Sequence, residues 1–81
     1  MKLIKFYTQT CVPCKMLKPI IEKLLVNHPE VQYEEIDCTD EVPKEWAQTI
    51  RSVPTVIIIK ANEPNIQIVG LHSYEYYDNL L

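Results

Sequence analysis

The sequence predicts an α/β fold in which a four-stranded mixed sheet is flanked by helices, in the order β-α-β-α-β-β-α. Two observations lead to this fold class. An apolar run at the N-terminus is followed by a long segment with apolar residues at helical spacing. The β-branched run Val56–Ile59 is separated from Ile66–Val69 by a turn rich in Asn and Pro, which is typical of a hairpin. A β-α-β opening that ends in a hairpin and a helix implies a mixed sheet with helices on its faces.

Residues 1–7 are expected to form a central strand because they are apolar on both faces apart from Lys5. A short polar loop follows, and Thr10 or Cys11 is expected to cap the first helix. Pro19 lies inside this helix and should bend it, and the helix is expected to stop near residues 27–29. The apolar residues predicted to face one core from this helix are Met16, Leu17, Ile20, Ile21, Leu24 and Leu25.

The second half of the chain begins with an expected strand at residues 31–37, with Tyr33 and Glu35 on one face and Ile36 on the other. Residues 40–50 are interpreted as a loop and a helix around Trp46. The hairpin strands come next, and Ser73 is expected to cap a last short helix.

Length and charge narrow the class of protein. We expect one domain, residues 1–81, since a chain of this size supports one small core. The net charge is −3 and the Lys and Arg residues are scattered, so we expect no nucleic-acid partner. The longest apolar run is too short to span a bilayer, and no signal-peptide pattern is visible, so we expect a cytoplasmic protein without a membrane partner. We also expect a monomer. In such a reducing compartment a close cysteine pair is catalytic or metal-binding.

Cys11 and Cys14 stand where the first strand meets the first helix. The unpaired N–H groups and partial positive charge at a helix N-terminus favour a thiolate over a thiol. A thiolate is the nucleophile of disulfide exchange, and the second thiol lies within closing distance. The leading interpretation is therefore a dithiol–disulfide oxidoreductase.

Metal binding is the main alternative for this pair. A zinc site needs about four ligands, and only Cys38, His28 and His72 remain, none of them in a second C-x-x-C, so we expect no metal. Inert thiols, or an iron–sulfur cluster bridging two copies, are further alternatives. Cys38 is interpreted as a small core residue, and as a regulatory or dimer-forming thiol if it is exposed.

Two motifs carry a resemblance to a known family. The first is C-V-P-C-K-M-L-K-P-I at residues 11–20, and the second is I-R-S-V-P-T at residues 50–55. With the predicted order of elements and Gly70, these resemble the thioredoxin superfamily, in the form of a short thioredoxin- or glutaredoxin-like redoxin. The resemblance covers essentially the whole chain and implies the minimal thioredoxin fold.

The resemblance also implies roles for individual residues. Cys11 corresponds to the exposed nucleophile and Cys14 to the resolving thiol that breaks the mixed disulfide. Pro54 corresponds to a cis-proline whose neighbour offers backbone groups to an extended substrate segment. The residues expected to contact substrate are Val12, Pro13, Val53, Pro54, Thr55 and Gly70.

The chain departs from the thioredoxin pattern at three positions. Thr10 stands in place of a tryptophan, and Val12 in place of a glycine. Lys5 replaces a buried aspartate that helps to take the proton from the resolving cysteine. Lys5 either reaches solvent along its stem or, like Lys15, lowers a thiol pKa by proximity.

Three function classes follow from the resemblance. The first is a protein-disulfide reductant with no bound cofactor, which carries electrons from NADPH through a thioredoxin reductase-like enzyme to targets such as ribonucleotide reductase. The second is a glutaredoxin reduced by glutathione, although the loop at residues 8–10 and the segment at residues 70–73 match that family poorly. The third is a non-catalytic interaction module that keeps the fold.

Overall fold

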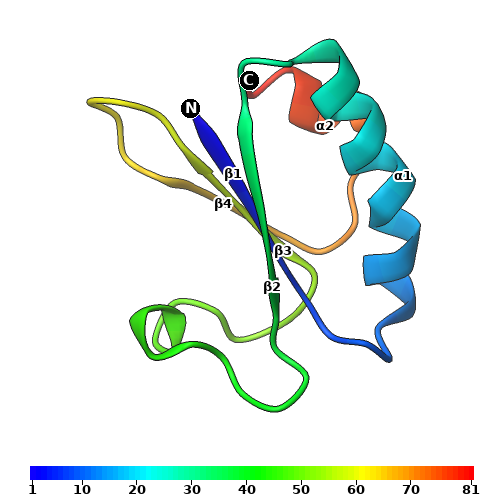
Figure 1. Ribbon diagram of the computed structural model, residues 1–81, viewed down its shortest axis with the longest axis vertical. Coiled ribbons are helices and arrows are strands. Elements are labelled where there is room, and N and C mark those ends of the chain that lie inside the picture. The colour runs from blue at the N-terminus through cyan, green and yellow to red at the C-terminus, as the bar shows by residue number, and fades with distance from the viewer.

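The computed structural model describes all 81 residues, and it has a four-stranded mixed sheet with both α-helices on one face (Figure 1). The elements in chain order are β1 (Lys2–Tyr7), α1 (Val12–Asn27), β2 (Gln32–Asp37), a 3₁₀ turn (Lys44–Trp46), β3 (Thr55–Ile59), β4 (Ile66–Val69) and α2 (Tyr74–Asp78). The strand order is β2-β1-β3-β4, with β1 parallel to β2 and antiparallel to β3, and β3 antiparallel to β4. The predicted fold class is confirmed. None of the helices is long and apolar enough to cross a membrane.

β1 is central, as its apolar sequence predicted, and its side chains alternate between two cores. Leu3 lies on the face covered by the helices, and Ile4 and Phe6 lie on the opposite face. The core under the helices consists of Leu3, Leu17, Ile21, Leu24, Val31, Val56, Ile58, Ile68 and Tyr77. The α1 residues in this list recur at helical spacing, so one stripe of the helix is buried. Met16 was expected there but is 56% exposed, because it lies one residue, about 100° around the helix, from Leu17.

The second face of the sheet is covered by the segment between β2 and β3 instead of by a helix (Figure 1). The helix expected within residues 40–50 is only a 3₁₀ turn, which Trp46 N–H closes by donating to Pro43 O at 2.9 Å. The apolar residues of this segment that pack onto the sheet are Val42, Trp46 and Ile50, and so short a helix is marginal on its own. Trp46 packs edge-on against Phe6 at 5.3 Å between ring centroids, and Ile50 is buried beside it.

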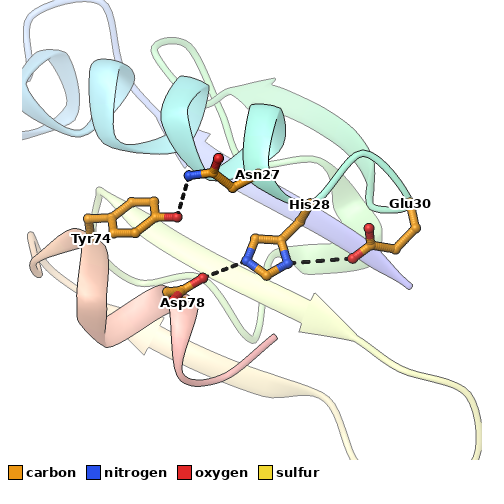
Figure 2. Close-up of polar contacts among 5 residues, drawn as sticks. All are labelled: Asn27, His28, Glu30, Tyr74 and Asp78. Carbon is orange, nitrogen blue, oxygen red and sulfur yellow. Dashed lines mark hydrogen bonds and ion pairs between the residues drawn. The ribbon is translucent and has the colours of Figure 1, made fainter.

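The end of α1 is fastened to α2 by side-chain contacts (Figure 2). Asn27 Nδ2 donates to Tyr74 Oη at 2.7 Å. His28 follows the helix and lies 2.6 Å from Asp78 Oδ1 through Nε2 and 3.5 Å from Glu30 through Nδ1. The hydrogen bond to Asp78 is the largest cause of a raised pKa at His28. These contacts hold the C-terminal helix against the end of α1.

The His28–Asp78 contact should make stability depend on pH. Because the pKa of His28 is raised in the folded protein, its stabilisation is full below the ordinary value of about 6.5 and is lost as pH rises through the raised folded-state pKa. Asp78→Asn should therefore lower the free energy of unfolding more at pH 6 than at pH 9, as measured by urea denaturation. Glu30→Gln is the matched control and should have a smaller effect, since its carboxylate is farther from the ring. Equal losses at both pH values for Asp78→Asn would show that the charge of His28 contributes nothing.

Candidate active site

The strand register brings distant segments to one end of the sheet. Tyr7, the last residue of β1, pairs with Asp37 at the end of the parallel strand β2. Phe6 pairs with Thr55 at the start of β3, and Thr55 pairs with Val69 at the end of β4. The segments that follow β1, precede β3 and follow β4 therefore meet at this end. They carry the residues that the sequence singled out.

The loop that leads from β1 to the first cysteine is tied to the end of β2. Gln9 Nε2 donates to Asp37 Oδ2 at 2.9 Å, and Gln9 N–H donates to Thr39 Oγ1 at 2.9 Å. Thr39 also donates to Asp37, and these hydrogen bonds hold the pKa of the Asp37 carboxyl below its usual value. Cys38 N–H donates to Tyr7 O at 2.7 Å and extends the ladder past β1. The chain thus enters α1 from a fixed position.

Cys11 is the N-cap of α1, as expected, with extended backbone angles (φ −86°, ψ 109°). Its sulfur accepts a hydrogen bond from Cys14 N–H at 3.2 Å, as a Ser or Asp oxygen does at this position. The two cysteines form a disulfide with their Cα atoms 5.2 Å apart. They differ in access to solvent, because Cys14 is only 3% exposed whereas Cys11 is half-buried. Cys11 is the sulfur that another molecule can reach.

The surroundings of Cys11 favour its thiolate once the pair is reduced. A hydrogen bond to the charged form of a group stabilises that form, and Cys14 N–H is placed to donate one. The positive end of the α1 dipole acts in the same direction. Pro13 has no N–H to donate, so Cys14 supplies the cap bond.

Pro54 lies beside this site, and the Val53–Pro54 peptide bond is cis, as the resemblance implied. Gly70 N–H donates to Pro54 O at 2.9 Å, which joins the segment after β4 to the proline. Thr55 is buried, and its Oγ1 donates to Ser52 O at 2.8 Å. Val53 is half-buried and lines a shallow hollow together with Thr8 of the loop before the first cysteine. The structure therefore places this segment at the same end of the sheet as the loop that leads to Cys11.

The surface around the cysteines is apolar and open on the α1 side. Val12 is 63% exposed and Pro13 is also exposed, and Met16 lies one turn along the helix from Val12. Exposed apolar side chains next to a reactive group are suited to contact with another protein. Thr55 differs from these residues, because it is buried and holds the turn before β3 instead of facing solvent.

A pocket on the other side of Cys14 contains a charged pair that the sequence did not predict. Lys5 was expected either to reach solvent or to lower a thiol pKa, and the first alternative is wrong: only 5% of its side chain is exposed, and its Nζ lies 3.0 Å from Glu35 Oε2. Glu35 was expected only to share a face of the second strand with Tyr33, and no role at the site was expected for it. The spacing of Tyr33 and Glu35 along β2 was the signal in the sequence that both side chains lie on one face. The contact of Glu35 with Lys5 could not be predicted, because it depends on the β1–β2 register. Lys15 is exposed and lines the same pocket.

The third cysteine lies near the site but has different surroundings. Cys38 is free and half-buried, and it lines the hollow that contains Val53. Burial, followed by the negative charge of Asp37, raises the pKa of the Cys38 thiol, so it is a weaker nucleophile than an unperturbed cysteine. No group of three or more His, Cys, Asp or Glu side chains is placed to hold a metal ion.

This arrangement defines a class of protein. An open, helix-capping cysteine, a buried cysteine in disulfide contact with it and an adjacent cis-proline segment make a dithiol–disulfide redox site on a mixed α/β sheet. Comparison with known proteins specifies the family. Residues 1–79 match the family model for thioredoxin, and the chain belongs to the thioredoxin family.

Relatives and solved structures agree with this assignment. The chain is 32% identical to the thioredoxin of Chlamydia pneumoniae over 79 residues, which cover 98% of this chain and 78% of the relative. It is 40% identical to the thioredoxin of Rickettsia bellii over 73 residues, or 86% of this chain and 68% of the relative. A mutant thioredoxin from Halobacterium salinarum superimposes with a TM-score of 0.81 at 29% identity, over 98% of this chain and 69% of that one. A chloroplastic thioredoxin z shares the fold, with a TM-score of 0.83 at 24% identity over 98% and 73% of the chains.

The protein is therefore a thiol–disulfide oxidoreductase with protein-disulfide reductase activity. The family match and the thioredoxin relatives support this activity, together with the bonded Cys11–Cys14 pair.

Gly70 offers a test of how the backbone at the site is held. Its φ is +89°, and a Cβ there would meet no atom within 4 Å, so Gly70→Ala introduces no clash. The left-handed backbone should still destabilise the variant by about 1–2 kcal/mol, measured by urea denaturation. Asn62→Gly, at the other position with positive φ, is the control and should not lower stability. A Gly70→Ala variant as stable as the parent would mean that this backbone conformation is not required.

Proposed function

We propose that Cys11 is the nucleophile and Cys14 the resolving thiol of a protein-disulfide reductant. The observation that carries this order is the difference in exposure, since Cys14 is 3% exposed and Cys11 is half-buried at the helix cap. The Cys11 thiolate attacks a sulfur of the substrate disulfide and forms a mixed disulfide. Cys14 then attacks Cys11 and releases the reduced substrate, which leaves Cys11 and Cys14 oxidised.

We propose that the substrate lies as an extended segment along Val53 and Pro54, where backbone groups provide affinity with little side-chain selectivity. Val12 and Pro13 would contact the substrate from the α1 side, since both are exposed beside Cys11. Gly70 would border the segment from the far side, since its N–H is bonded to Pro54. Thr55 would act indirectly by fixing the turn that presents Pro54.

The wider proposal concerns electron source, partners and location. Thioredoxins act on protein disulfides and are re-reduced by a reductase, and we propose NADPH through a thioredoxin reductase-like enzyme as the source, with ribonucleotide reductase among the targets. No bound cofactor takes part, because thiol–disulfide exchange needs only the two sulfurs. We place the protein in the cytoplasm, because a reductant of disulfides works in a reducing compartment. We also propose that residues 1–81 form one domain, because both cores share one sheet. We propose that this domain acts as a monomer.

Single cysteine variants test the order of the two thiols. Cys11→Ser should abolish reduction of insulin disulfides, because the accessible nucleophile is lost. Cys14→Ser should form the first bond but not resolve it, so mixed disulfides with target proteins should accumulate and be visible on non-reducing gels. Cys38→Ser is the control and should reduce insulin at the parent rate.

Two results would contradict the proposal. Mixed disulfides that accumulate with Cys11→Ser instead of Cys14→Ser would reverse the assigned order. Reduction of the oxidised protein by glutathione, with no reduction by NADPH and a thioredoxin reductase, would replace the proposed electron source while leaving the order of the thiols intact.

A further inference from the structure

Lys5 is the one charged residue among the buried residues of the protein. It lies on β1 two residues after Leu3, on the face of the sheet that α1 covers. Burying an ammonium group is costly unless it is paired and hydrogen-bonded. The position therefore needs a partner, and the structure supplies two.

Glu35 and Tyr7 hold the Lys5 ammonium group. Glu35 is the register partner of Lys5 on β2, and Lys5 Nζ lies 3.0 Å from Glu35 Oε2 and 5.4 Å from the centroid of the Tyr7 ring. Tyr33 Oη donates to the same carboxylate oxygen at 3.1 Å. The hydrogen bond from Lys5 is the largest cause of a lowered pKa at Glu35, so this carboxylate stays ionised beside the Lys5 ammonium group.

The pair shares a pocket with the buried cysteine. The titratable groups that line this pocket are Lys5, Tyr7, Cys14, Lys15, Lys18 and Glu35. Burial by itself disfavours a thiolate, whereas a nearby cation favours it. Lysines outnumber the single carboxylate around the pocket, and Lys5 is the buried one, where charge is screened least.

We propose that Lys5, held in place by Glu35, stabilises the thiolate of Cys14 during the second half of disulfide exchange. Lys5 is a positioning residue that acts through Cys14, and the inference rests on the proposed order of the two thiols. In this step Cys14 gives its proton to water in the open pocket, and its sulfur bonds to Cys11 Sγ. The bond between Cys11 and the substrate sulfur breaks, and the electron pair leaves with the substrate as a thiolate. The dithiol is oxidised by two electrons and the substrate disulfide is reduced by two.

Neither member of the pair is suited to take the proton itself. A charged lysine has no free electron pair to accept one. Glu35 is a weak base because its pKa is lowered, and a good general base has a pKa near the working pH. The role that remains for Lys5 and Glu35 is to stabilise the Cys14 thiolate by the charge of Lys5.

The test titrates Cys14 in a chain that has no other thiol. Cys11→Ser with Cys38→Ser leaves Cys14 alone beside an uncharged neighbour, as in the mixed disulfide. The pH dependence of iodoacetamide alkylation, followed by mass spectrometry, gives the apparent pKa of Cys14. Adding Lys5→Met should raise this pKa by about one unit, the lower end of the shift that a nearby opposite charge produces.

Two matched variants show whether the charge at this place is responsible. Lys5→Arg retains the charge and should keep the pKa of Cys14 close to that of the parent. Lys2→Met removes the exposed lysine that pairs with Glu34 at 2.7 Å on the same two strands, and it should leave Cys14 unchanged. An unchanged pKa with Lys5→Met, or an equal rise with Lys2→Met, would overturn the inference.

A kinetic measurement tests the same inference in the intact pair. In a Cys38→Ser background, reaction with Ellman's reagent forms a mixed disulfide at Cys11, and Cys14 then releases the second coloured thiolate. A rise of about one unit in the pKa of Cys14 reduces its thiolate fraction about tenfold but makes the remaining thiolate more nucleophilic. Lys5→Met should therefore slow this release about threefold at neutral pH. An unchanged release rate would overturn the inference. Failure of all variants to form the mixed disulfide would instead contradict the role of Cys11.

Discussion

The two hydrogen-bonded ladders of β1 are the constraint on which the rest of the structure depends. A parallel ladder to β2 and an antiparallel ladder to β3 bring the end of β1, the end of β2 and the start of β3 to one edge. The loop that leads to Cys11, the segment with the cis-proline Pro54, and Gly70 meet there as a result. The same register places Lys5 opposite Glu35 beneath α1. One strand therefore positions both the open side of the redox site and the charged pocket behind it.

The two sulfurs lie in different surroundings. Cys11 has the helix terminus and the N–H of Cys14, which are backbone features of any helix that begins at this position. Cys14 is buried, and the charged side chains of the pocket that it lines come from β1, β2 and α1. Exposure thus separates an accessible sulfur from a buried one, and the proposed order of attack gives the two sulfurs different steps. The chemistry of a dithiol reductant needs both kinds.

Sequence alone predicted what is local. The cap of α1, expected at Thr10 or Cys11 and found at Cys11, depends on neighbouring residues. So do the hairpin and the cap at Ser73, which were found where expected. The helix expected around Trp46 needs more packing than the segment has, and the structure contains only a single 3₁₀ turn there. The burial of Lys5 and its contact with Glu35 depend on the pairing of two strands separated by α1. Hydrophobic periodicity carries no information about such a contact between polar residues.

The reduction potential of the Cys11–Cys14 pair tests the central claim most directly. The protein would be equilibrated in thiol–disulfide buffers of defined potential, and the oxidised fraction would be measured after alkylation of free thiols. A protein-disulfide reductant of the thioredoxin family should have a reduction potential of about −270 mV. A value of about −200 mV or higher, or no equilibration with the buffer, would contradict the account of this pair as a general reductant.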